Sequence, residues 1–111
     1  MEKLDIKVRK SAKGGFIEGS FFVKQLDFDE CIALHEKSGD DGNARLVQMC
    51  LVKADGEPVF KPQQVNLIKD RLSGVDYMCV LITCNELNDF AKIGQLADKY
   101  AKNSESVPNS N

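Results

Sequence analysis

The sequence predicts a mainly α-helical α+β fold: one small domain of about four to five helices with a short N-terminal β-hairpin. After Asp27, apolar residues recur at three- and four-residue steps over most of the chain, which is the period of a helix. Aromatic and β-branched residues gather instead at residues 16–23, which favours extended strands there. A chain of 111 residues with 42% hydrophobic residues suffices for one modest core and is too short for two.

Three regions are expected along the chain. Residues 1–15 are predicted to be a flexible basic lead-in, residues 16–102 the globular domain, and residues 103–111 a disordered tail. The lead-in is polar and ends in two glycines, and the tail offers almost no apolar side chain to bury. Alternation of apolar and polar residues from Leu4 to Val8 leaves a short edge strand in the lead-in as the alternative.

Two elements are expected before the central helix. Residues 16–23 surround Gly19 and predict either a short hairpin or two extended segments joined by a glycine turn. Asp27 then provides an N-cap, and Glu30 is its reciprocal partner in a capping box three residues later. A helix with one apolar face follows, and we expect it to end near Gly39.

The segment RLVQMCLVKADGEPVF at residues 45–60 is expected to form the nucleus of the fold. Its first half is apolar on most sides of a helix, which predicts a buried helix up to Leu51. Asp55-Gly56 predicts a tight turn, because glycine reaches positive φ without a Cβ clash. Phe60 returns the chain to the core, and Pro62 begins a short helix because proline is tolerated in the first turn.

Two further helices complete the prediction. Ser73 is expected to cap a helix over residues 75–84 that is apolar on nearly all sides. A small domain seldom covers such a helix completely, so we expect part of it to face a partner. The last helix, capped by residues 87–89, carries a narrow stripe that includes Phe90 and Ile93 and is suited to docking rather than burial.

Composition argues against a membrane or nucleic-acid partner. The formal net charge is −2, and no run approaches the roughly 18 apolar residues that a membrane span requires. Residues 1–13 carry five basic and two acidic side chains, a net charge of +3, whereas the rest of the chain carries −5. We interpret this basic end as a solvated terminus. The N-terminus has no apolar segment typical of a signal peptide, which predicts a cytosolic protein.

The four cysteines are expected to be buried free thiols, since each lies in an apolar segment: Cys31, Cys50, Cys79 and Cys84. His35 is the single histidine, so the ligand set of a zinc site is incomplete. Cys31 and His35 are one helical turn apart but lack a third group that would orient the histidine as a base. Common nucleotide-binding and hydrolase motifs are missing from the sequence. We therefore predict no metal, no cofactor and no enzymatic activity.

The order of these segments resembles the tail assembly chaperone family of long-tailed (siphovirus-type) phages. The resemblance is carried by RLVQMCLV-x-x-DGEPVF at residues 45–60 and by the helix that ends Asn85-Glu86-Leu87-Asn88. It extends upstream to FFVKQLDFDE at residues 21–30 and covers roughly residues 16–90. In that family an apolar helix led by arginine, a DG connector ending in phenylalanine, and a helix with a Leu-Asn element occur in this order.

The resemblance implies a phage or prophage protein that acts in the host cytoplasm during tail morphogenesis and is absent from the mature virion. Its relatives bind the tape measure protein, keep it soluble and help to recruit tail tube subunits around it. It also implies a homo-oligomer, whereas Arg45 and Asp55-Gly56 match positions that look structural in the family. The alternatives are a small head–tail adaptor or connector that stays in the particle, and a DNA-binding regulator.

Five residues are predicted to contact a partner: Tyr77, Met78, Leu81, Phe90 and Ile93. Met78 is the preferred contact, because a methionine side chain adapts to helices of varied shape. The other four lie beside it on the apolar stripes of the last two helices. The alternative is that all five belong to the ordinary core of the domain.

Overall fold

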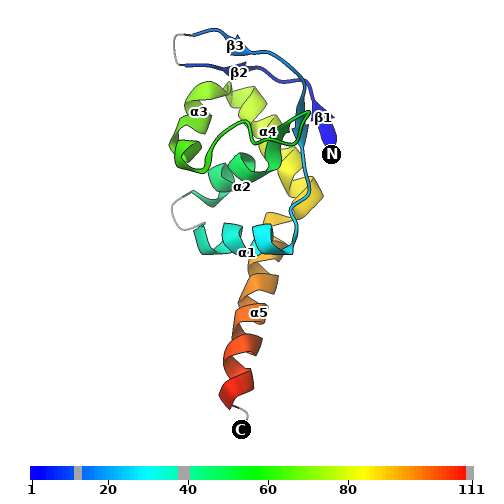
Figure 1. The fold of residues 1–111 in the computed structure, drawn as a ribbon, viewed down its shortest axis with the longest axis vertical. Helices are drawn as coiled ribbons and strands as arrows, with labels where there is room; N and C mark the ends of the chain where they lie inside the picture. Colours follow the sequence, from blue (N-terminus) through cyan, green and yellow to red (C-terminus); the bar gives the residue numbers. More distant parts are fainter. Residues whose placement is uncertain (12–13, 38–40, 110–111) are drawn as a thin grey trace.

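The computed structural model describes residues 1–11, 14–37 and 41–109, with the side chains of 37, 90 and 103–109 excepted. Figure 1 shows a small body of helices with strands beside it, from which a C-terminal helix projects. The described strands are β1 (Glu2–Leu4), β2 (Val8–Arg9), β3 (Phe16–Ile17), β4 (Phe21–Val23) and β5 (Leu51–Lys53). The described helices are α1 (Phe28–Lys37), α2 (Gly42–Cys50), the 3-10 helix η1 (Pro62–Leu67), α3 (Ile68–Arg71), α4 (Gly74–Asn88) and α5 (Phe90–Asn109). The predicted helix-dominated α+β class is confirmed.

The strands form two small antiparallel sheets. One sheet has the order β1-β4-β5, and its central strand β4 pairs Val23 with Glu2 on one side and with Leu51 on the other. The second sheet is the pair β2-β3, in which Val8 lies opposite Ile17. Of the two alternatives for residues 16–23, the structure has two extended segments, because β3 and β4 pair with different strands. The N-terminal hairpin is therefore β2-β3.

The prediction that residues 1–15 are a flexible lead-in is wrong. β1 supplies one edge of the three-stranded sheet, and β2 forms half of the hairpin. Ile6 is buried and Val8 is fully buried in the main hydrophobic core. The physical reason is that β4 would otherwise have an unpaired edge, with a row of free backbone donors and acceptors. The alternation of apolar residues from Leu4 to Val8 was the signal for this arrangement.

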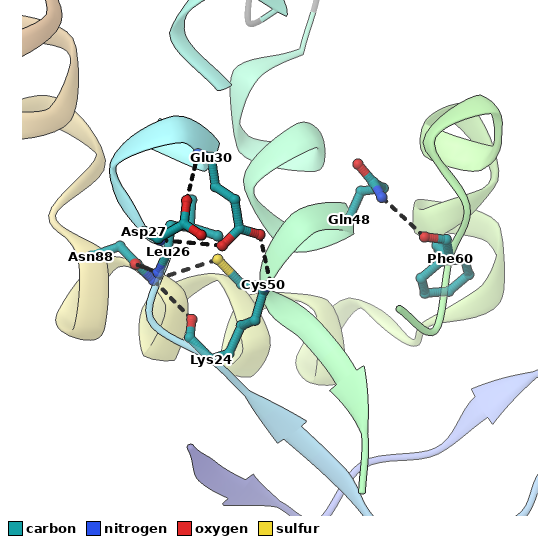
Figure 2. Close-up of polar contacts among 8 residues, drawn as sticks. All are labelled: Lys24, Leu26, Asp27, Glu30, Gln48, Cys50, Phe60 and Asn88. Carbon is teal, nitrogen blue, oxygen red and sulfur yellow. Dashed lines mark hydrogen bonds and ion pairs between the residues drawn. The ribbon is translucent and has the colours of Figure 1, made fainter. Parts of the chain in front are cut away.

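Helix α2 supplies the centre of the core, where Leu46, Val47 and Cys50 are fully buried. The predicted helix ends one residue earlier than expected, because Leu51 begins strand β5 and pairs with β4. The turn that follows is confirmed: Gly56 has φ +87°. The buried Gln48 side chain donates to the Phe60 carbonyl at 3.1 Å, which fixes the returning segment to α2 (Figure 2).

The predicted caps of α1 and α4 are present. The Glu30 N–H donates to Asp27 at 2.8 Å and the Asp27 N–H donates to Glu30 at 3.2 Å, which completes the capping box at the start of α1. The Asp76 N–H donates to Ser73 Oγ at 3.1 Å at the start of α4. The expected end of α1 near Gly39 lies outside the described residues. These caps fix where α1 and α4 begin, and hence which side chains each helix presents to the core.

Asn88 joins the end of α4 to the segment that leads into α1. Its side-chain oxygen accepts from the Leu26 N–H at 2.7 Å. Its amide nitrogen donates to the carbonyls of Lys24 at 3.3 Å and Cys84 at 3.0 Å, and lies 3.4 Å from the Cys50 sulfur. Figure 2 shows the contacts with Lys24, Leu26 and Cys50 converging on this side chain. The amide thereby sets the position of the start of α1 relative to the start of α5.

Helix α5 departs from the predicted boundary at its C-terminal end. The structure continues this helix to Asn109, where a disordered tail was expected from residue 103 onward, so that prediction is corrected up to Asn109. An existing helix is extended one residue at a time without a new nucleation cost, and Pro108 is the first strong helix breaker in the segment. Figure 1 shows α5 extending away from the body of the domain.

Candidate protein-interaction surfaces

An apolar groove lies between α1 and α5, with a volume of about 210 Å³. We call it the α1/α5 groove and define it by its lining residues: Phe28, Cys31, Ile32, Ile93, Leu96, Ala97 and Tyr100. Ile93 and Ala97 are buried between the two helices, whereas Phe28, Leu96 and Tyr100 form a rim whose side chains are each half exposed or more. A groove with apolar walls and exposed apolar rims is suited to receive another apolar surface.

The capping box and the α5 contacts together shape the α1/α5 groove. The cap places Phe28 in the first turn of α1, where its ring remains largely exposed. That ring meets the edge of the Tyr100 ring with centroids 5.4 Å apart and planes at 82°. Further along α1, His35 Nε2 lies 3.1 Å from Asp98 Oδ1. These two contacts hold α5 against α1.

A second apolar surface runs along α4 and faces away from the core. We call it the α4 stripe and define it as Val75, Met78, Cys79 and Ile82, which are spaced i, i+3, i+4 and i+7 and therefore share one helix face. Val75 is 81% exposed, Met78 51% and Ile82 52%. The opposite face of α4 is fully buried at Val80 and Cys84. The expectation that an all-round apolar helix would leave part of itself uncovered agrees with this arrangement.

The five predicted contact residues do not lie on one surface. Met78 belongs to the α4 stripe, whereas Tyr77 and Leu81 are partly buried and pack against the core. Ile93 is only 9% exposed and lines the α1/α5 groove as part of the core cluster, so it is not on an exposed stripe, and its contact with a partner stays a prediction. The side chain of Phe90 lies outside the described residues.

Sequence reasoning missed other residues of these surfaces. Val75 and Ile82 follow the helical period of Met78 and were available from that spacing alone. Phe28 and Leu96 required knowledge of how α1 and α5 pack, because each is more exposed than the apolar residues one turn further along or back on its own helix. Only the contact between the two helices decides which of their apolar residues remain on a rim.

The thiols differ in their surroundings. All four cysteines are free, and Cys79 is exposed on the α4 stripe, so the expectation that every thiol is buried is wrong at this position. Burial, followed by the charges of Asp27 and Glu30, raises the pKa of Cys31 in the groove. A hydrogen bond with Cys84, followed by burial, raises the pKa of Cys50 in the core. The Cys50 thiol is therefore protonated and unreactive at neutral pH.

The described residues contain no cluster of three or more His, Cys, Asp or Glu side chains that would hold a metal ion. No helix within the described part of the chain has the length and apolar character needed to cross a membrane. The α1/α5 groove and the α4 stripe both present exposed apolar side chains. Comparison with protein-family models, with curated proteins and with solved structures finds no match to this chain.

Proposed function

We propose that this protein is a non-catalytic chaperone of phage tail assembly, and that its α1/α5 groove holds apolar helical segments of the tape measure protein. In this proposal it acts in the host cytoplasm, helps to bring tail tube subunits to the tape measure, and leaves before the virion is complete. The observation that carries the proposal is an open groove with apolar walls on a domain of only 111 residues. The sequence resemblance supplies the identity of the client.

The dimensions of the groove suit a helical client. Its α1 wall runs from Phe28 to Ile32, about one helical turn or roughly 6 Å, and its α5 wall runs from Ile93 to Tyr100, about two turns or roughly 10 Å. A client helix of matching length offers apolar residues at i, i+3 and i+4 to such a groove, which is a common mode of peptide recognition. Contacts of this size are individually weak, so a long client is held by many chaperone copies and released when tube subunits replace them.

The test compares two substitutions on neighbouring residues of α5. Leu96→Glu places a charge on the groove rim, where Leu96 is 54% exposed, so the charge stays hydrated until a client arrives. Gln95→Glu introduces the same charge at an adjacent exposed position outside the lining. Each variant is expressed with a tape measure fragment, and the soluble fraction of the fragment is measured alongside the thermal melt of the chaperone.

We expect Leu96→Glu to lose most of the solubilising activity while it keeps the parental melt, and Gln95→Glu to retain both. Equal solubilisation by both variants would show that the groove does not hold the client. Mass spectrometry of purified particles distinguishes the alternative class, because a head–tail adaptor remains in the virion and a chaperone does not.

A further inference from the structure

We propose that the α4 stripe is a self-association surface, on which a second copy of this chain packs its own α4 in the antiparallel direction. The face is separate from the α1/α5 groove, so this inference does not depend on what the groove binds. It starts from four apolar side chains on one helix face that the described part of the chain leaves exposed.

Charges at the two ends of α4 select both the partner and its direction. At the N-terminal end, the Arg71 side chain donates to the Lys10 carbonyl and the Lys7 N–H donates to Asp76, which gathers three basic residues and one acidic residue there. At the C-terminal end, Glu86 and Asp89 are both exposed. Lys92 follows one turn into α5.

An antiparallel second copy matches this polarity. Each basic end then lies beside the acidic end of the other copy, whereas a parallel pairing places like charges together. The two helix dipoles also oppose each other in this arrangement. With the two-fold axis between Met78 and Cys79, Val75 of one copy faces Ile82 of the other, and the two Cys79 side chains lie close to the axis.

The surface is too small for a permanent dimer. A stable interface buries about 800 Å² on each partner, and one stripe of two helical turns with four side chains supplies much less. The pairing is therefore reversible and depends on concentration, with a contribution from charge that salt screens.

The first experiment is sedimentation velocity of the reduced full chain over a wide concentration range. We expect a monomer–dimer equilibrium that Ile82→Glu weakens by roughly tenfold or more. Leu96→Glu is the matched control, because Leu96 has nearly the same exposed fraction (54% against 52%) but lies on the groove. A monomer at every concentration, or a dimer that Ile82→Glu leaves unchanged, overturns the proposal.

The second experiment tests the direction by disulfide trapping. Diamide accepts two electrons and two protons from a pair of thiols and becomes the hydrazine, so each trapped dimer reports one disulfide. We expect a parental dimer that Cys79→Ser abolishes. In the Cys79→Ser background, a chain with Val75→Cys should cross-link to a chain with Ile82→Cys more readily than to itself. Preferential Val75→Cys homodimers would indicate parallel helices and overturn the antiparallel arrangement.

Discussion

Asn88→Ala is expected to destabilise the domain by about 2–4 kcal/mol, a large share of the roughly 5–15 kcal/mol that stabilises a typical domain. The substitution leaves the Leu26 N–H and the Lys24 carbonyl without the partners they have at 2.7 and 3.3 Å. Each unpaired buried group costs about 1–3 kcal/mol. Because this site is only partly buried, we take about 1–2 kcal/mol for each of the two groups, which together give about 2–4 kcal/mol.

Urea unfolding followed by circular dichroism measures this effect. With a slope of about 2 kcal/mol per molar urea, the middle of the usual range, the midpoint should fall by roughly 1–2 M. Glu86→Ala is the control, because Glu86 is exposed two residues earlier on the same helix and its loss should change stability by no more than about 0.5 kcal/mol. If Asn88→Ala unfolds at the same midpoint as the control, the amide does not stabilise the junction between α4 and α1.

Three further predictions follow from single residues. In the native protein a thiol reagent should modify Cys79 first and should reach Cys50 and Cys84 only after unfolding; equal rates would contradict their burial. Gly56→Ala should lower the free energy of unfolding by about 1 kcal/mol, because φ is +87° there; an unchanged urea midpoint would contradict this. A hydrogen bond from Lys69, followed by one from the Ala44 N–H, lowers the pKa of Asp41. The stability that Asp41 contributes is therefore fully present above the unfolded pKa of about 3.9 and is lost as pH falls through the lower folded pKa. Asp41→Asn should therefore be less stable than the parent at pH 7 and equal to it near pH 2, as measured by paired denaturation curves.

Features of the fold that depend on neighbours within four residues were predictable from the sequence. The capping box of Asp27 and Glu30, the Ser73 cap and the turn at Gly56 all form from local chemistry, and all three are present. In each case the residues of the motif supply both the hydrogen-bond donor and the acceptor, or they include the residue type that the backbone conformation requires. No information about the rest of the chain was needed.

The sheet was less predictable, because its strands are short and their partners are distant. β5 has three residues and follows α2 directly, so in the sequence its apolar residues continue the helical pattern of α2. Leu51 becomes a strand residue only because Val23 is available to pair with it. β1 similarly requires β4 as a partner. Pairing between distant segments overrides the local pattern in both cases.

The break between α4 and α5 explains why the predicted contact residues separate onto two surfaces. On an unbroken helix, Ile82 and Ile93 would be eleven residues or about three turns apart and would share one face. Cys84 is nine residues before Ile93, about two and a half turns, so a helix that buries Cys84 would leave Ile93 in solvent. Asp89 interrupts the helix with φ +51°, and its side chain accepts from the Lys92 N–H at 3.2 Å to begin a new one. The second helix can therefore bury Ile93 against α1 while Ile82 stays exposed, which gives this small domain two independent apolar surfaces.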